Sequence, residues 1–212
     1  DGSFSIGGLR TGVYSVSASS PYYAFTPASY ALSPLNAPRL DLVFDAGPKH
    51  GAAVVHYRKG WNLLSLPVDP DTRDIAALFA DASAPAIAYR YSPDSGYIGE
   101  TQLHFGTGYW IKFSKTDSVS IVGSMRGDFR VPLTGGMGGW NLIGGASGAV
   151  PIAAIVQSPP GLLVTIYQFN PGEGYRLPAG DILRPGLGYF VKVRNDALFT
   201  LISSFTGSRE QL

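Results

Sequence analysis

The chain has 212 residues, 45% of them hydrophobic and only 15% charged, so it can bury cores for about two or three small domains. Lys and Arg number 16 and Asp and Glu number 15, and this formal net charge of +1 excludes the strongly basic surface that nucleic acids and anionic membranes select. The absence of Cys excludes disulfides and thiolate metal sites, and no apolar run approaches the roughly 18 residues of a membrane helix.

The composition favours an all-β fold. Gly (27) and Pro (16) are abundant, and 12% of the residues are aromatic. Turn formers between aromatic and β-branched segments are typical of short strands joined by tight loops. A disordered chain would instead have few aromatic residues and a high net charge.

Residues 1–47 are predicted to contain strands at 4–6, 14–18 and 40–44, where apolar and polar side chains alternate. The glycines of Gly7–Gly12 predict a turn with positive φ between the first two strands.

One motif in this region links it to a known family. The pattern Asp1-Gly2-x-Phe4-x-Ile6-x-Gly8-Leu9-x-x-Gly12-x-Tyr14-x-Val16 resembles the carboxypeptidase regulatory-like family, a prealbumin-like β-sandwich common in bacterial surface proteins. In that family several strands precede the Asp-Gly turn, whereas here it is the first dipeptide. The resemblance therefore implies an incomplete sandwich. We expect Phe4, Ile6, Tyr14 and Val16 to be covered by another chain or by an upstream part of the same precursor.

Three motifs then occur twice in the same order. Gly60-Trp61-Asn62-Leu63 returns as Gly139-Trp140-Asn141-Leu142, Tyr89-x-Tyr91-x-Pro93 as Tyr167-x-Phe169-x-Pro171, and Gly106-x-Gly108-Tyr109-Trp110 as Gly186-x-Gly188-Tyr189-Phe190. The copies lie about 80 positions apart in every case, which marks an internal duplication. We place a linker at 48–53, a first repeat at 54–126 and a second at 127–212.

Each repeat is predicted to be β-rich with one short helix. The helix is expected at 71–80 in the first repeat, where acidic residues precede apolar ones at helical spacing, and at 151–156 in the second, after Pro151. The Pro-x-x-Gly segments at 93–96 and 171–174 are expected to close hairpins.

The twin units resemble the Gly-Trp-Asn-Leu repeats near the C termini of large secreted bacterial proteins. The resemblance covers residues 54–205 and implies an extracellular or cell-surface location and an architecture, but no activity. Because each repeat must fill the same interior, we expect the repeated aromatic residues to be core anchors: Trp61, Trp140, Tyr109, Tyr189, Trp110 and Phe190. Gly108 and Gly188 are expected where a side chain would meet forbidden φ/ψ or a close backbone, so that replacing either destabilises mainly its own repeat.

The repeated aromatic residues have an alternative interpretation as a platform that stacks on sugars. Five further aromatic residues are better candidates for an outer contact surface: Tyr22, Tyr23, Tyr30, Tyr57 and Tyr97.

Residue patterns for catalysis or metal binding are weak. The histidines, His50, His56 and His104, lie in different elements without ligand spacing. Asp69, Asp71 and Asp74 suggest a calcium loop, but helix capping explains them more simply. The glycine-rich run at 135–139 leads into a strand, so it predicts a turn and not a phosphate loop. We therefore predict no enzyme activity, cofactor or metal.

These observations lead to two functional hypotheses. The first is a secreted structural subunit that self-associates into a surface or extracellular filament, with strand complementation between copies. The donor would be the segment from Leu198 through Leu201 to Phe205 of a neighbouring copy. The alternative is an adhesion or carbohydrate-binding appendage of a larger secreted protein, with surface glycans as partners.

Overall fold

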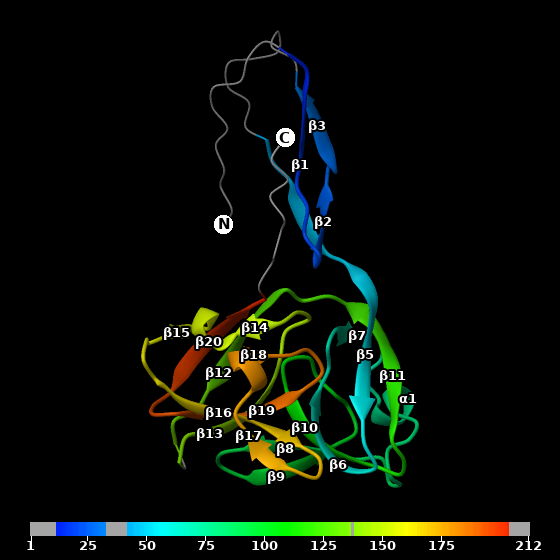
Figure 1. The fold of residues 1–212 in the computed structure, drawn as a ribbon, viewed down its shortest axis with the longest axis vertical. Coiled ribbons are helices and arrows are strands. Elements are labelled where there is room, and N and C mark those ends of the chain that lie inside the picture. The colour runs from blue at the N-terminus through cyan, green and yellow to red at the C-terminus, as the bar shows by residue number, and fades with distance from the viewer. Residues whose placement is uncertain (1–11, 33–41, 137, 204–212) are drawn as a thin grey trace. The chain divides into compact units, whose positions relative to one another are not determined.

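The computed structural model describes residues 12–32, 42–136 and 138–203 (Figure 1). The chain divides into two compact units, unit 1 (Asp1–Lys49) and unit 2 (His50–Leu212). Antiparallel strands dominate both, and the described residues contain one four-residue α-helix, so the all-β prediction is confirmed. The expected contact residues Phe4, Ile6 and Phe205 lie outside the described part of the chain.

Unit 1 consists, where it is described, of two strand pairs. β1 (Tyr14–Ser17) pairs with β3 (Ser29–Leu32), and β2 (Tyr23–Thr26) pairs with β4 (Asp45–Pro48). β1 lies where the alternation predicted it. Of the strand expected at 40–44, residues 40 and 41 lie outside the described part of the chain, residues 42–44 are not in a strand, and β4 begins directly after them. β2 and β3 were not predicted, although both have period-two alternation of half-buried and exposed side chains.

The first half of unit 2 forms two sheets. Its elements are β5 (His50–Tyr57), β6 (Gly60–Ser65), β7 (Asp69–Pro70), α1 (Ile75–Leu78), β8 (Ala88–Ser92), β9 (Gly96–Glu100), β10 (Gly108–Phe113) and β11 (Asp117–Ser124). The four-stranded sheet has the order β6-β10-β8-β9 and the three-stranded sheet the order β5-β11-β7. β5 begins at His50, so residues 50–53, which we expected in a linker, belong to a strand.

The second half of unit 2 repeats this arrangement. Its elements are β12 (Asp128–Leu133), β13 (Trp140–Gly144), β14 (Val150–Pro151), η1 (Ile152–Ala154), β15 (Val156–Ser158), β16 (Leu163–Asn170), β17 (Gly174–Arg176), η2 (Ala179–Asp181), β18 (Ile182–Leu183), β19 (Gly188–Val193) and β20 (Ala197–Ile202). The four-stranded sheet β13-β19-β16-β17 has the strand order of its counterpart in the first half, and the pair β12-β20 corresponds to β5-β11. The third strand of the smaller sheet differs, because β7 precedes α1 whereas β15 follows η1, and β14-β18 is an additional short pair.

The helices are shorter than expected. In the first repeat only Ile75–Leu78 is helical, and the Asp74 carboxylate caps it by accepting the N–H of Ala77 at 3.0 Å. In the second repeat a 3₁₀ turn, Ile152–Ala154, replaces the expected α-helix at 151–156, and β15 follows at once. The second segment lacks a side-chain cap, and its β-branched residues suit a strand better than a helix.

Each repeat has its own core, centred on an equivalent tyrosine. Tyr109 is 1% exposed, and its hydroxyl accepts the N–H of His104 at 3.0 Å. Tyr189 is fully buried, and its hydroxyl accepts the N–H of Arg184 at 2.6 Å. The hydroxyl of each tyrosine therefore forms a hydrogen bond with the loop that precedes its own strand.

The repeated Asn also acts alike in both halves. Asn62 accepts the N–H of Arg58 at 2.9 Å, and its amide donates to the carbonyls of Arg58 at 2.7 Å and Gly60 at 3.0 Å. Asn141 makes the same three bonds, to Thr134 and Gly139. In the Trp-Asn-Leu motif, the Asn therefore holds the turn that precedes its strand.

Candidate functional site

The two repeats meet through the faces of their four-stranded sheets. Leu63, Leu142 and Phe190 are buried there, and half-buried aromatic residues pack around them, among them Trp110 and Trp140. The interface is therefore formed by the same motif residues contributed twice. Such a pairing of equivalent surfaces is the arrangement of a two-fold dimer, here contained in one chain.

Backbone hydrogen bonds across the interface follow the same symmetry. Ser65 donates to the Gly186 carbonyl at 3.0 Å, and the equivalent Gly144 donates to the Gly106 carbonyl at 2.9 Å. Each Gly-x-Gly loop thus binds the end of the other repeat's Trp-Asn-Leu strand.

Gly108 and Gly188 are required by this contact. A Cβ on Gly108 would lie 2.6 Å from the Ile143 carbonyl oxygen, and a Cβ on Gly188 would lie 2.9 Å from that of Leu64. Both approaches are too close for any side chain. The expectation of a close backbone was right, but that backbone belongs to the other repeat. Because both repeats lie in one compact unit, we now predict that either substitution destabilises both repeats, in place of the separate response expected from the sequence.

The repeated aromatic residues differ in burial. Tyr109, Tyr189 and Phe190 are buried, whereas Trp110 and Trp140 are half-buried at the inter-repeat interface. Trp61 is 44% exposed, so its assignment as a core anchor was wrong.

The aromatic residues chosen as an outer contact surface also differ. Tyr57 is 5% exposed and stacks on Phe113 with ring centroids 3.9 Å apart, so it is a core residue and that prediction was wrong. Tyr97 is 55% exposed, as expected. Tyr22, Tyr23 and Tyr30 are half-buried.

Trp61 and its counterpart Trp140 have different surroundings. The Nζ of Lys192 lies 5.4 Å from the centroid of the Trp140 ring and covers it. The ring of Trp61 packs edge to face on the rings of Tyr89 and Trp110, with centroids 5.9 Å and 6.5 Å apart. Trp61 is nonetheless 44% exposed to solvent. Lys112 is its partner in register on β10 and is exposed.

A second exposed aromatic pair lies where the hairpins of the two sheets meet. Tyr97 and Tyr175 occupy equivalent positions and are 55% and 49% exposed. Partial burial, followed by the neighbouring phenol of Tyr97, raises the pKa of Tyr175 above its ordinary value. Tyr175 also packs edge to face on Phe190, with centroids 5.8 Å apart.

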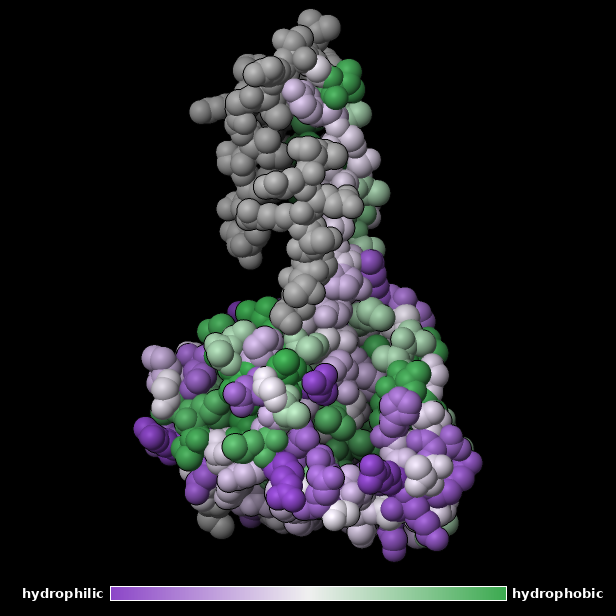
Figure 2. Space-filling view, in the orientation of Figure 1, coloured by the Kyte–Doolittle hydropathy of each residue, from purple (hydrophilic) through white to green (hydrophobic). Residues whose placement is uncertain are grey.

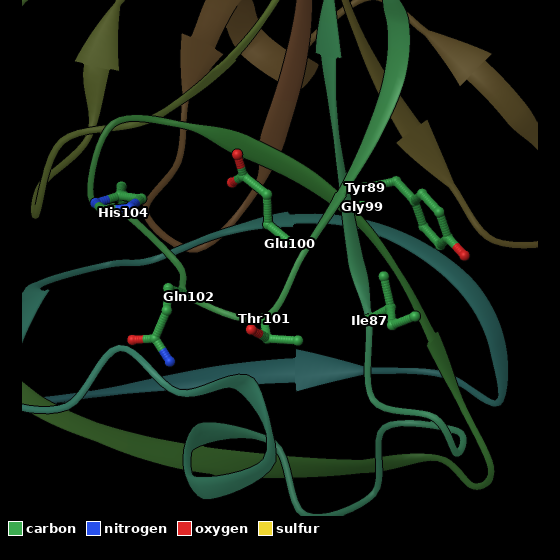
Figure 3. A pocket seen from close by; sticks show the side chains of 7 residues that line it. All are labelled: Ile87, Tyr89, Gly99, Glu100, Thr101, Gln102 and His104. Carbon is green, nitrogen blue, oxygen red and sulfur yellow. The ribbon is translucent and has the colours of Figure 1, made fainter.

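A pocket of about 460 Å³ lies along β9, the edge strand of the first four-stranded sheet (Figure 3). It is lined by Ile87, Tyr89, Gly99, Glu100, Thr101, Gln102 and His104. Ile87 and Tyr89 lie on one side of the strand, and Glu100 and His104 lie on the other.

Three polar side chains of this pocket already have partners. Glu100 forms an ion pair with Arg90, and His104 Nδ1 lies 3.3 Å from Arg73 Nη1. Gln102 donates to Asp74 at 3.4 Å. These contacts engage the carboxylate, the imidazole and the amide of the lining.

The aspartates considered for calcium are held apart by separate partners. Asp69 accepts from Arg126 at 2.8 Å, Asp71 pairs with His50 at 2.9 Å, and Asp74 caps α1. Among residues 12–32, 42–136 and 138–203, no three His, Asp or Glu side chains converge as metal ligands would. His56 points outward from β5.

The segment expected to complete a neighbouring copy is instead part of unit 2. β20 is hydrogen-bonded to β12 on one edge and to β15 on the other. Leu201 is fully buried in the core of the second repeat. A strand paired on both edges cannot be donated without unfolding its own sheet, so the assignment of this segment as the donor was wrong.

The outer face of the same sheet is partly apolar. Leu198 and Ile202 alternate with Leu201 and are 37% and 44% exposed, and Val156 lies beside them on β15. In Figure 2, apolar side chains gather over the region of unit 2 that contains these strands in Figure 1. Within the described ranges, no helix has the length and apolar character needed to cross a bilayer.

Comparison of the chain with models of known protein families, with curated proteins and with solved structures finds no match in any of the three. Fold, burial and surface chemistry are therefore the observations from which a function can be inferred.

Proposed function

We propose that this chain is a non-enzymatic, extracellular structural subunit whose copies associate through unit 1. The observation that carries the proposal is the burial pattern of that unit. None of residues 12–32 and 42–49 is buried, although one side of its strands is apolar. The extracellular location rests on the resemblance of the N-terminal motif and of the repeats to families of secreted bacterial surface proteins.

The apolar side of unit 1 is built like half of a core. Phe44 packs edge to face on Phe25 and Tyr30, with ring centroids 6.4 Å and 5.1 Å apart. These rings remain half-buried, as do Tyr14 and Val16 on β1. An isolated two-stranded ribbon is marginal in water, and a second layer over this side would stabilise it.

The apolar side of unit 1 supplies a means of association. Two such sides can pack face to face, as the two layers of a β-sandwich do. Because β20 is committed to its own sheet, we propose unit 1 of a second copy as the partner that covers this side.

A pair of substitutions on β2 tests the proposal. Phe25→Asp places a charge on the apolar side, and Ala24→Asp places the same charge on the exposed side of the same strand. Sedimentation velocity of the whole chain at increasing concentration should show self-association of the wild type and of Ala24→Asp, and monomers for Phe25→Asp. Electron microscopy would distinguish closed dimers from filaments.

Two results would contradict the proposal. One is a wild type that stays monomeric at every concentration. The other is association that persists in Phe25→Asp. Circular dichroism of each variant checks that unit 2 keeps its β structure, so that a loss of association is assigned to unit 1.

A further inference from the structure

We propose that the exposed ring of Trp61, with the cations around it, binds an acidic polysaccharide, meaning a chain of sugars that carry carboxylate groups. The site lies in unit 2 and is independent of the association proposed for unit 1. It is formed by the start of β6, the turn before it and the facing residue of β10.

The duplication provides an internal reference for this ring. Trp140 has the same motif and the same position in its sheet, yet it is half-buried and covered by Lys192. Trp61 has a lysine at the matching position, Lys112, and is nonetheless open to solvent. The indole ring is therefore exposed in the first repeat, whereas Lys192 covers the equivalent ring in the second repeat.

Three cationic residues lie on the segments that carry the open ring. Lys112 is opposite Trp61 in the ladder, and Lys59 lies two residues before it in the exposed turn. The guanidinium of Arg58 donates to the Pro171 carbonyl at 3.4 Å, which leaves its charge uncompensated. Among the ion pairs formed by the described residues, none involves these three cations.

Two carboxylates near the loop after β10 are bound to a different cation. Lys115, in the loop after β10, is bound by both Asp81 at 3.3 Å and Asp117 at 2.8 Å. Hydrogen bonds from Lys115 and from the Ser118 N–H lower the pKa of Asp117. These carboxylates are thus engaged with Lys115, and the cations beside Trp61 remain available to an anionic ligand.

The combination of an open indole and separate cations suits a uronic acid chain. The C–H face of a sugar ring packs on an aromatic face, and carboxylates pair with Lys and Arg. Tyr89 contacts Trp61 and also lines the pocket along β9, so a polymer stacked on Trp61 can continue into that pocket. A single-stranded nucleic acid would need a continuous basic groove, which a net charge of +1 does not supply.

Titration calorimetry of the whole chain with oligomers of alginate, a polyuronate, tests the site. The wild type should bind, and added salt should weaken binding because exposed charges are screened. Trp61→Ala should lower the affinity roughly tenfold, as loss of one stacked ring implies. Lys59→Gln and Lys112→Gln should each lower it roughly threefold, in the range of exposed charge pairs.

Matched variants control for unspecific effects. Lys192→Gln removes the cation at the equivalent position of the second repeat, and Tyr97→Ala removes another exposed ring. Both should bind alginate like the wild type. The proposal is overturned if the wild type does not bind alginate, if it binds the neutral glucan laminarin equally well, if single-stranded DNA binds more tightly, or if Trp61→Ala keeps full affinity.

Discussion

Replacement of Gly108 by Ala should destabilise the whole of unit 2 and not one repeat alone. The added Cβ would lie 2.6 Å from the Ile143 carbonyl oxygen and 2.9 Å from two carbon atoms of Leu142. The carbonyl is backbone and cannot rotate away, so β13 has to shift relative to β10. Because β13 carries Leu142 into the inter-repeat cluster, that shift also disturbs the packing between the sheets.

The size of the effect follows from the overlap. Overpacking a rigid site costs typically 1–3 kcal/mol, and a clash with backbone belongs at the upper end, roughly 3 kcal/mol. For a domain of this size, each kcal/mol corresponds to roughly 2–4 °C, so the melting temperature should fall by roughly 6–12 °C. Gly188→Ala should behave similarly, since its Cβ would lie 2.9 Å from the Leu64 carbonyl oxygen.

Differential scanning calorimetry is the appropriate assay, because it resolves whether the two repeats melt together. Gly136→Ala is the matched control: its Cβ would meet only the Thr134 methyl group at 3.7 Å, so the melting temperature should hardly change. Two separate transitions, with Gly108→Ala shifting only the first repeat, would refute the argument that the repeats form one cooperative unit.

Two further predictions concern the repeated motif and the buried phenols. Asn62→Ala should cost about 3 kcal/mol in urea unfolding, at about 1 kcal/mol for each of three hydrogen bonds, and Asn141→Ala should cost a similar amount. Burial, followed by the hydrogen bond to Asp81, raises the pKa of Tyr57 to about 12, and burial raises the pKa of Tyr189 to about 12. Tyrosines of the unfolded chain ionise near pH 10, so unit 2 should lose stability as the pH rises from about 10 to about 12, and Tyr57→Phe should lose less of it over that window.

The sequence was most informative where geometry is fixed by Gly, Pro and Asn. The hairpins between β8 and β9 and between β16 and β17 lie where the Pro-x-x-Gly segments predicted them. It was least informative for the short helices. The second helix was expected from Pro151 alone, and β-branched residues after it favour the extended chain of β15.

Burial of the aromatic residues could not be predicted from the motif. Trp61 and Trp140 share the motif Gly-Trp-Asn-Leu and have equivalent lysine partners, yet they differ in exposure, so the motif does not determine burial. Tyr57 was assigned to the surface because it is not repeated. In the structure it stacks on Phe113, whereas Leu133 and Val193 occupy the corresponding positions of the second core. An aromatic residue that is not repeated can therefore lie in a core that is packed differently in the two repeats.

The pairing of β20 with β12 and β15 could not be predicted from the sequence for a different reason. Its hydrogen-bonding strand β12 lies far away in sequence, and alternation alone does not indicate which strands pair. A segment near the end of the pattern therefore resembled a free donor, although both of its edges are used. The buried Leu201 and the exposed Leu198 and Ile202 show the period-two pattern of an ordinary half-buried strand.

Duplication changes what the repeated surface can do for association. A single repeat would expose Leu63 and Trp110 on its four-stranded sheet, and it could cover them only by pairing with another copy. Two repeats in one chain cover this face internally, since Leu142 and Phe190 take the place of that copy. This apolar face is thereby buried between the two repeats. Contacts with other molecules must then use surfaces outside this interface. We therefore place them at the half-buried apolar side of unit 1 and at the exposed ring of Trp61.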